Sequence, residues 1–225
     1  LNPRHTVETL LAQPLTLYFG LRGDALRQRC IELLERVRLG AHYLDRLPGQ
    51  MSGGEKQRVA IARAFAAEPD LVLCDEITSA LDVSVQAAVL ELLQSLKHDK
   101  GTACLMVSHD LAVVRSLADR VAVLYQGRLC EVGPAAAVYA APSHPYTEAL
   151  LGAVLDPDPD HVPRLLARDV TESAPPACGC PFQRRCPVRL GAICDEQMPP
   201  WQNGSAPGHA IRCHIPIVQR MEVAP

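Results

Sequence analysis

Several features are scarce or missing in this chain of 225 residues, and each absence excludes a class of protein. Lys and Arg number 22 against 25 Asp and Glu, so the basic excess typical of a nucleic-acid surface is absent. Apolar runs are short, and none approaches the ~20 residues that a membrane-spanning helix needs. The N-terminus, LNPRHTVETLLAQPL, has no signal-peptide layout and no initiator Met, and it starts in mid-pattern. We therefore expect this chain to be cut from something longer.

Proline and cysteine are distributed unevenly along the chain. Four of the 19 prolines precede residue 134, and five of the nine cysteines fall between residues 178 and 213. These shifts predict three parts, of which residues 1–133 form a dense α/β body. Residues 134–170 are expected to form a short helical segment and a linker, and residues 171–225 a small tail rich in cysteine and proline.

Hydrophobic periodicity predicts alternating helices and strands in the body. Helices are expected at 24–39, from 52 to a stop at Pro69, at 83–99 and at 110–120, with apolar strands at 71–74 and 102–109. Residues 121–133 are typical of a hairpin that turns at Gln126-Gly127. This alternation indicates an α/β fold with a mostly parallel sheet, whose strands are buried and whose ligands bind at the carboxyl ends of the strands.

The segment LPGQMSGGEKQRVAIARAF, residues 47–65, joins a Ser-Gly-Gly triplet to the start of a helix. Ser52 and Glu55 have the spacing of a capping box, in which each side chain satisfies a backbone amide of the other residue. Free amides at a helix N-terminus attract anions, and Gly53 and Gly54 let a phosphate approach the backbone closely. Taken alone, the triplet is explained more simply as a flexible loop before a capped helix.

Gly49 and Gly54 also have the spacing of a phosphate-binding P-loop, GxxxxGK[ST], but the rest of that pattern is missing. Glu55 stands where the loop needs Lys, and no buried strand precedes the segment. No other segment of these 225 residues fits the pattern. The sequence therefore offers a helix start suited to an anion without a P-loop to accompany it.

Two acidic residues follow the apolar segment LVLC. Asp75 is placed to hold Mg²⁺ against phosphates, and Glu76 is placed to polarise an attacking water. His109 ends the neighbouring strand, so we expect it to face the same crevice as Glu76. Taken singly, the two acids are equally typical of an ordinary solvent-facing pair, and a lone histidine is more often structural than catalytic. Their common position at strand ends favours a catalytic site.

The order and spacing of four segments are more specific than any one of them. MSGGEKQR, LVLCDE, TSALD and VSHD follow one another as in the ATP-binding subunits of ABC transporters, which this chain resembles from residue 1 to about 155. The resemblance implies a P-loop NTPase-like ABC ATPase domain, of which this chain is the C-terminal part: a helical signature region plus a sheet core. It makes MSGGE the signature motif, LVLCD the Walker B strand, Glu76 the catalytic glutamate and His109 the switch histidine.

The same resemblance assigns further roles and identifies two departures. Ser79 and Asp82 correspond to the D-loop, and the signature residues 52–55 are expected to bind the γ-phosphate of ATP held by a second ATP-binding subunit or domain in a head-to-tail dimer. Glu55 replaces the usual Gln, and Ile77 replaces the usual Pro. The upstream segment of the family, which carries the P-loop, the base-stacking aromatic and the Q-loop glutamine, is expected to precede residue 1.

The C-terminal part narrows the resemblance to importers of oligopeptides, dipeptides or nickel. SHPYTEALLGAV (143–154) and GCPFQRRCP (179–187) are similar to the C-terminal extension of those proteins, although the first also fits a plain amphipathic helix that starts at Pro145. The leading hypothesis is a peripheral subunit at the cytoplasmic face of the membrane that hydrolyses ATP with Mg²⁺. Its expected partners are two transmembrane permease subunits and, indirectly, an extracytoplasmic substrate-binding protein, with no nucleic acid. The resemblance places the permease-docking surface in residues 1–50, which by themselves are equally typical of a solvated face.

Two other hypotheses stay open. A non-transport ABC ATPase, acting for example on ribosomes or DNA, usually joins two ATPase domains or carries a long coiled-coil insertion, and the importer-type tail argues against both. Alternatively, the chain is an inactive truncated fragment with only a docking or cluster-binding role, because it has no P-loop. A P-loop upstream in the intact gene would separate these readings.

Four cysteines of the tail have the spacing C-x5-C-x7-C-x18-C, with a fifth as a spare: Cys180, Cys186, Cys194 and Cys213, and Cys178. Thiols in a cytosolic chain stay reduced, so disulfides are the weaker interpretation. A Pro-rich segment that can bury little apolar surface needs another source of stability, such as a bound metal. Paired C-x2-C knuckles are absent, so spacing alone leaves zinc and an iron–sulfur cluster open. The pattern resembles peptide-importer tails that hold a [4Fe-4S] cluster, which favours a structural cluster. His209 and His214 are reserve ligands if the metal is zinc.

Overall fold

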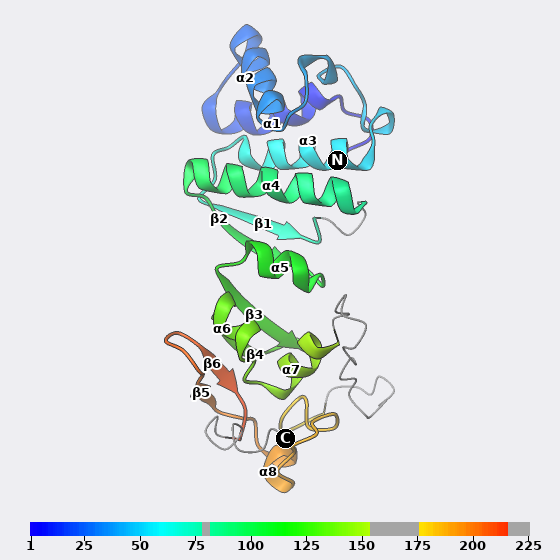
Figure 1. Cartoon of the computed structure of the whole chain (residues 1–225). Helices are drawn as coiled ribbons and strands as arrows, with labels where there is room; N and C mark the ends of the chain where they lie inside the picture. The colour runs from blue at the N-terminus through cyan, green and yellow to red at the C-terminus, as the bar shows by residue number, and fades with distance from the viewer. Residues whose placement is uncertain (78–81, 154–175, 216–225) are drawn as a thin grey trace. The chain divides into compact units, whose positions relative to one another are not determined.

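The structure is a computed structural model that describes residues 1–77, 82–153 and 176–215 (Figure 1). The chain divides into two compact units, Leu1–His109 and Asp110–Pro225. None of the helices in the described ranges is long and apolar enough to cross a membrane.

The first unit consists of helices packed on a short parallel pair of strands. Its elements are α1 (Val7–Phe19), α2 (Gly23–Arg36), the 3-10 turns η1 (Ala41–Tyr43) and η2 (Pro48–Gln50), α3 (Gly53–Phe65), β1 (Leu71–Asp75), α4 (Val83–Lys100) and β2 (Ala103–Val107). Figure 1 shows α4 lying between α3 and the two strands. One apolar core joins all four helices to β1, with Leu11, Leu34, Val59, Val89 and Val72 among its buried members. Each such side chain stabilises the unit by about 1.5–3 kcal/mol, so burial fixes how these helices pack.

The helix boundaries follow local backbone conformation. α4 ends at Gly101, which has φ of +65° and therefore favours glycine, as the sequence predicts. α2 ends at Arg36 instead of continuing to residue 39. Arg38 has φ of +58°, and the amide of Leu39 donates to the carbonyl of Leu34, so the chain turns back before Gly40 is reached.

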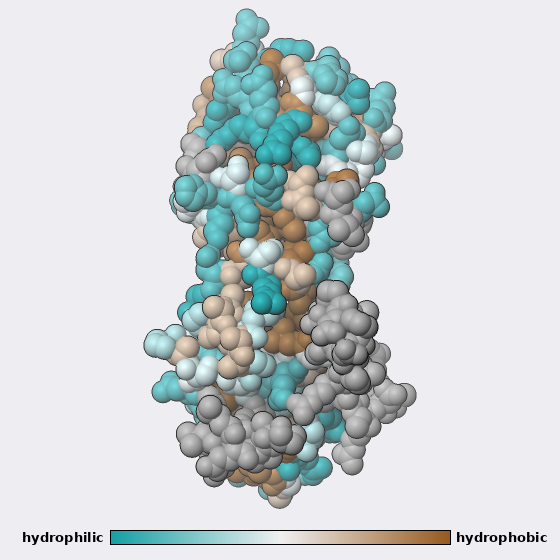
Figure 2. Space-filling model, in the orientation of Figure 1, coloured by the Kyte–Doolittle hydropathy of each residue, from teal (hydrophilic) through white to brown (hydrophobic). Residues whose placement is uncertain are grey.

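The two parallel strands pair in register, from Leu71 with Ala103 to Asp75 with Val107. Alternate residues of β1 point into the core, whereas Leu71 and Leu73 on the other face are 53% and 70% exposed. Leu105 and Val107 are likewise exposed on β2, and Figure 2 shows apolar surface at the level of these strands. The sequence prediction of fully buried strands is therefore wrong for the described residues, in which one face of the sheet is covered.

The second unit is organised around an antiparallel sheet with the strand order β3-β4-β6-β5. Its elements are α5 (Leu111–Leu117), β3 (Arg120–Tyr125), β4 (Arg128–Pro134), α6 (Ala135–Ala140), α7 (Pro145–Gly152), α8 (Ala192–Glu196), β5 (Trp201–Asn203) and β6 (Ala210–Arg212). The predicted hairpin turn is confirmed, since Gln126 and Gly127 have φ of +47° and +74°, typical of a type I′ turn. Among the described strands, only β1 and β2 pair in parallel. The alternation of helices and strands in the sequence predicts a larger parallel sheet.

The boundary between the two compact units lies between His109 and Asp110, and not at residue 134, where the proline content changes. β6, from the cysteine-rich tail, pairs with β4 of the hairpin through Glu131 with Ile211 and Val132 with Ala210. Backbone hydrogen bonds between distant segments thus place the hairpin with the tail instead of with the preceding body. The three-part functional division stays a prediction.

Candidate functional site

Glu76 and His109 meet at the carboxyl ends of the two parallel strands. The amide of Glu76 donates to the carbonyl of Val107 at 3.0 Å, which extends the β1–β2 ladder by one residue. Glu76 has φ of +45°, a conformation that costs a non-glycine residue about 1–3 kcal/mol and that clusters at functional sites. Its Oε1 lies 3.0 Å from Nδ1 of His109. Because a carboxylate only accepts hydrogen bonds, Nδ1 carries the proton in this contact.

This pair is open to solvent, with side-chain exposures of 51% for Glu76 and 72% for His109. Asp75, the last residue of β1, is exposed beside it. A carboxylate that holds Mg²⁺ through water and another that takes a proton from water both need such access. The prediction that these groups share one edge of the sheet is supported by where the strands end.

The D-loop residues lie between β1 and α4. Ser79 is outside the described residues. Asp82 is the N-cap residue of α4, and its carbonyl accepts a hydrogen bond from the amide of Gln86 at 2.8 Å. Ile77, which stands where the family has Pro, is half-buried and packs against the core. Side-chain packing thus helps to hold residue 77 itself in place.

The signature segment begins α3 with the predicted capping box. Ser52 Oγ accepts from the amide of Glu55 at 3.3 Å, and Glu55 Oε2 accepts from the amide of Ser52 at 2.8 Å. Gly54 has a packing role that the sequence did not reveal, because a Cβ there would lie 2.4 Å from Cγ1 of Val85. α3 and α4 therefore approach closely at their N-terminal ends, while Gly53 is the first residue of α3.

Glu55 is held from a second side by a residue that the sequence patterns did not identify. The Tyr43 hydroxyl donates to Oε1 of Glu55 at 2.5 Å, and the guanidinium of Arg46 lies 4.4 Å from the centre of the Tyr43 ring. The Tyr43 hydrogen bond, followed by the amide of Ser52, lowers the pKa of the Glu55 carboxyl. The same hydrogen bond raises the pKa of the Tyr43 phenol. The pair is therefore an ionised carboxylate and a neutral phenol.

Four cysteines of the tail line one pocket, together with His214 and Phe182: Cys180, Cys186, Cys194 and Cys213. The amide of Cys180 donates to the carbonyl of Cys194 at 2.8 Å. A Cβ on Gly179 would lie 2.3 Å from the carbonyl oxygen of Asp195, so only glycine permits this close approach of the two segments. Burial, followed by the neighbouring thiols, raises the pKa of Cys180 to about 11.

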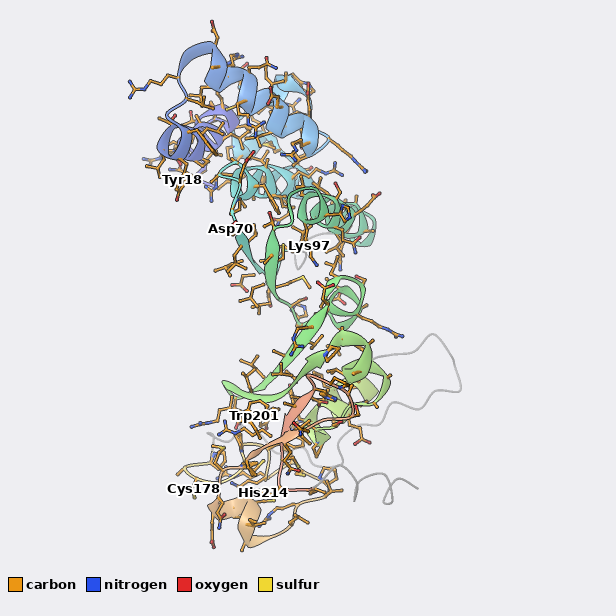
Figure 3. All side chains as sticks on the ribbon, turned by 90° about the vertical axis from the view of Figure 1, so that its left-hand side faces the viewer. Tyr18, Asp70, Lys97, Cys178, Trp201 and His214 are labelled. Atoms are coloured by element: carbon orange, nitrogen blue, oxygen red, sulfur yellow. The ribbon has the colours of Figure 1, made fainter. Side chains whose placement is uncertain are left out.

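The described residues contain no group of three or more His, Cys, Asp or Glu side chains arranged for a metal ion. Figure 3 shows Cys178 and His214 near α8, where Cys178 Sγ donates to the carbonyl of Asp195 and His214 Nε2 contacts the carbonyl of Gln197. The shared pocket gives the cysteines a common environment, and a bound metal stays a prediction.

His209 is not a reserve metal ligand, contrary to the sequence-based expectation. Its Nδ1 accepts from the amide of Ser205 at 3.1 Å, so Nε2 carries the proton and donates to Oε1 of Glu131 at 2.7 Å. Both side chains are fully buried. Because the two ring nitrogens are engaged within the protein, neither is available to a metal.

Glu131 is the centre of a buried network that sequence reasoning missed. Besides His209, its carboxylate accepts from the amides of Ser143 and His144 at 2.7 and 2.9 Å. These donors come from the segment before α7 and from the loop before β6, so the network ties three distant segments together. An acid within an otherwise apolar strand, LCEVG, was the available signal, but its partners are remote in sequence.

Comparisons with known proteins agree with the motifs. The family described as ABC transporter matches residues 1–79, and the family described as oligopeptide/dipeptide transporter, C-terminal region, matches residues 130–194. A probable peptide ABC transporter ATP-binding protein of Sinorhizobium fredii is 41% identical over 96% of this chain. A putative peptide import ATP-binding protein of Brucella ovis is 42% identical over 95%, and the oligopeptide transport ATP-binding protein OppF of Salmonella typhimurium is 41% identical over 95%.

The chain spans 61% of the Sinorhizobium protein, 67% of the Brucella protein and 64% of OppF. Among solved structures, a dimeric ATP-binding cassette in a post-hydrolysis state bound to ADP and Pi aligns with a TM-score of 0.54 at 34% identity, covering 60% of this chain and 59% of that one. A putative metal-chelate type ABC transporter in an inward-facing conformation aligns with a TM-score of 0.54 at 27% identity, covering 59% and 53%. The fold is therefore that of the α/β ATP-binding cassettes.

Proposed function

Because this chain belongs to the ABC transporter ATPase family, in the branch with the oligopeptide/dipeptide transporter C-terminal region, we propose that it powers a peptide-class importer. The complete protein binds and hydrolyses ATP and couples the reaction to uptake. The observation that carries this proposal is the Glu76–His109 pair at the ends of two adjacent parallel strands, in the same unit as a capped signature helix. The relatives' names concern peptide transport, which favours this function over a non-transport ATPase.

In the proposed hydrolysis step, Glu76 takes the proton of the attacking water as the water oxygen bonds to the γ-phosphorus, while the bond from that phosphorus to the β–γ bridging oxygen breaks and ADP leaves with the electron pair. His109 holds the Glu76 carboxylate in place through Nδ1, and its own side chain is largely exposed. Asp75 would hold Mg²⁺, which would supply positive charge against the developing charge on the phosphate oxygens. The D-loop residues Ser79 and Asp82 are proposed to line the junction with the partner.

The signature helix is proposed to act on ATP held by a second ATP-binding subunit or domain, in a head-to-tail dimer. The Ser52 hydroxyl and the amides of Gly53 and Gly54 lie at the positive end of the α3 dipole, which stabilises a phosphate. Glu55 caps this helix start. A dimeric cassette among the structural relatives supports such a pairing.

The proposed membrane partners are two transmembrane permease subunits, with an extracytoplasmic substrate-binding protein acting through them. The end of α1 offers a docking surface, because Leu17, Tyr18 and Phe19 are 75%, 67% and 48% exposed. Figure 3 shows the Tyr18 side chain on the outside of the helical region. Crosslinks from residues 1–50 to a permease would support this assignment, whereas crosslinks confined to residues 171–225 would contradict it.

For the tail we propose a structural [4Fe-4S] cluster on Cys180, Cys186, Cys194 and Cys213. Four thiols around one pocket supply the Cys₄ donor set that such clusters use. The described thiols are not arranged around a metal ion, so their geometry does not separate a zinc ion from a cluster, and the resemblance to peptide-importer tails favours the cluster. Anaerobically purified protein should be brown with roughly four irons per chain. A colourless protein with one tightly held zinc would contradict the cluster, and a metal-free folded tail would contradict any metal.

An ATPase assay on the 225 residues alone tests whether the catalytic carboxylates can act without a P-loop. These residues contain no P-loop, so little holds a triphosphate within the chain, and we expect turnover near background. Mg²⁺-dependent turnover should appear once a segment carrying the P-loop is joined to this chain, and Glu76→Gln should then abolish it, because Glu76 serves ATP held beside its own strands. Robust turnover by the isolated 225 residues, lost on Glu76→Gln, would mean that the site is complete without a P-loop.

A further inference from the structure

We propose that Tyr43 is a positioning residue for the signature motif, because its hydroxyl holds the acidic side chain of Glu55 in a fixed place beside the phosphate-binding helix start. This inference rests on the proposed function. It concerns a residue outside the four signature residues, on the 3-10 turn η1, that acts only through Glu55.

An acidic residue at this point of the motif creates a specific difficulty. A free carboxylate is itself an anion, and the first amides of α3 attract anions. An unrestrained Glu55 would compete with the γ-phosphate for those amides and would repel it. A glutamine carries no charge, so it does not repel the phosphate and competes less strongly for the amides.

Two hydrogen bonds remove this competition. Oε2 of Glu55 accepts from the amide of Ser52 at 2.8 Å, and Oε1 accepts from the Tyr43 hydroxyl at 2.5 Å. Both oxygens are therefore directed to the N-cap and to η1. The amides of Gly53 and Gly54, which follow the cap, are left for a ligand.

Arg46 completes the arrangement from the same segment. Its guanidinium lies 4.4 Å from the centre of the Tyr43 ring, and its positive charge acts on the Glu55 carboxylate. The phenol is thus held from one side by a cation and bonded on the other to an anion. The net charge presented next to the helix start is smaller than a lone glutamate would give.

Tyr43 also packs partly against the apolar core, so a general packing role has to be separated from the positioning role. Tyr43→Phe keeps the ring and removes the hydroxyl alone. The positioning role requires a charge at residue 55, whereas the packing role does not. The effect of Tyr43→Phe should therefore depend on whether residue 55 is Glu or Gln.

The experiment measures nucleotide-dependent pairing of the complete ATPase with its partner, in a Glu76→Gln background that prevents hydrolysis. The MgATP concentration for half-maximal pairing is determined with Tyr43→Phe, Glu55→Gln, both together, and neither. We expect Tyr43→Phe to raise this concentration about three- to tenfold beside Glu55, and to leave it unchanged when Gln is at residue 55. Raising the salt concentration should shrink the first effect, because it screens the repulsion.

Tyr139→Phe is the matched control, because that hydroxyl bonds only the carbonyl of Leu111 among its described contacts and lies in the second unit. Thermal unfolding of each variant verifies that the first unit remains folded. Equal effects of Tyr43→Phe in both backgrounds, or no effect in either, would overturn the positioning role while leaving the proposed function intact. Failure of the unsubstituted pair to assemble with MgATP would overturn the proposed function and this inference together.

Discussion

Among the described residues, each compact unit contains a Glu–His pair, and the two pairs lie in opposite environments. Glu76 and His109 in the first unit lie 3.0 Å apart with about half or more of each side chain exposed. Glu131 and His209 in the second unit lie 2.7 Å apart and are fully buried. Water and phosphate can reach the first pair. The second pair is closed to solvent, and its described hydrogen-bond partners are groups of the protein itself. Burial, not residue type, separates a candidate catalytic pair from a structural one.

The largest expected effect is on the exposed pair. Glu76→Gln in the complete ATPase should lower turnover about 10²–10³-fold, because the attacking water loses its proton acceptor. MgATP binding should persist, so that an ATP-bound dimer accumulates. The measurement is steady-state phosphate release together with size-exclusion chromatography in MgATP.

His109→Ala should lower turnover less than Glu76→Gln and should change nucleotide affinity little. Asp75→Asn should instead weaken binding in a Mg²⁺-dependent way. Unchanged steady-state hydrolysis in Glu76→Gln would show that another group is the general base.

Substitution in the buried pair should lower the free energy of unfolding without changing catalysis. His209→Leu removes one donor from the buried Glu131 carboxylate, which retains the amides of Ser143 and His144. We expect a loss of about 2–4 kcal/mol in the free energy of unfolding. Denaturant titration followed by the near-ultraviolet signal of the aromatic residues measures it.

His98→Leu is the comparison variant, because His98 is exposed on α4, and its change should be within about 0.5 kcal/mol. If His209→Leu were as stable as His98→Leu, the buried network would not hold the second unit together. Loss of ATPase activity without loss of stability would assign the pair a catalytic role instead.

A smaller effect is expected where α3 approaches α4. Gly54→Ala places a methyl group 2.4 Å from Cγ1 of Val85, and the overlap should destabilise the first unit by about 1–3 kcal/mol, partly offset by the higher helix propensity of alanine. Gly49→Ala is the control, because a Cβ there meets nothing within 4 Å. Equal unfolding midpoints for the two variants would show that the close approach carries no energetic weight.

The smallest effect concerns thiol chemistry in the second unit. Burial raises the pKa of Cys130 to about 12, so its reactive thiolate is scarce at pH 8 and increases only toward that pKa. Cys178 is exposed. Brief treatment with iodoacetamide at pH 8 should modify Cys178 and leave Cys130 intact, as read by mass spectrometry. Rapid modification of Cys130 under native conditions would show that the second unit opens there.

The sequence alone determined the elements whose causes are local. The capping box at Ser52 and Glu55, the stop of α4 at Gly101 and the turn at Gln126-Gly127 each depend on neighbouring residues, and each was predicted correctly. The spacing of the motifs also identified the family, since it fixes which residues end adjacent strands. The roles of the individual site residues stay predictions.

Only the tertiary structure decided which residues far apart in sequence meet. Tyr43 with Glu55 and Glu131 with His209 depend on how the chain folds back, and neither pairing leaves a periodic pattern in the sequence. Histidine in particular is ambiguous, because metal ligation, catalysis and burial all suit its two nitrogens. His209 was predicted as a reserve ligand and is a buried donor. The physical reason is that burial and hydrogen-bond partners come from packing, which one-dimensional spacing does not contain.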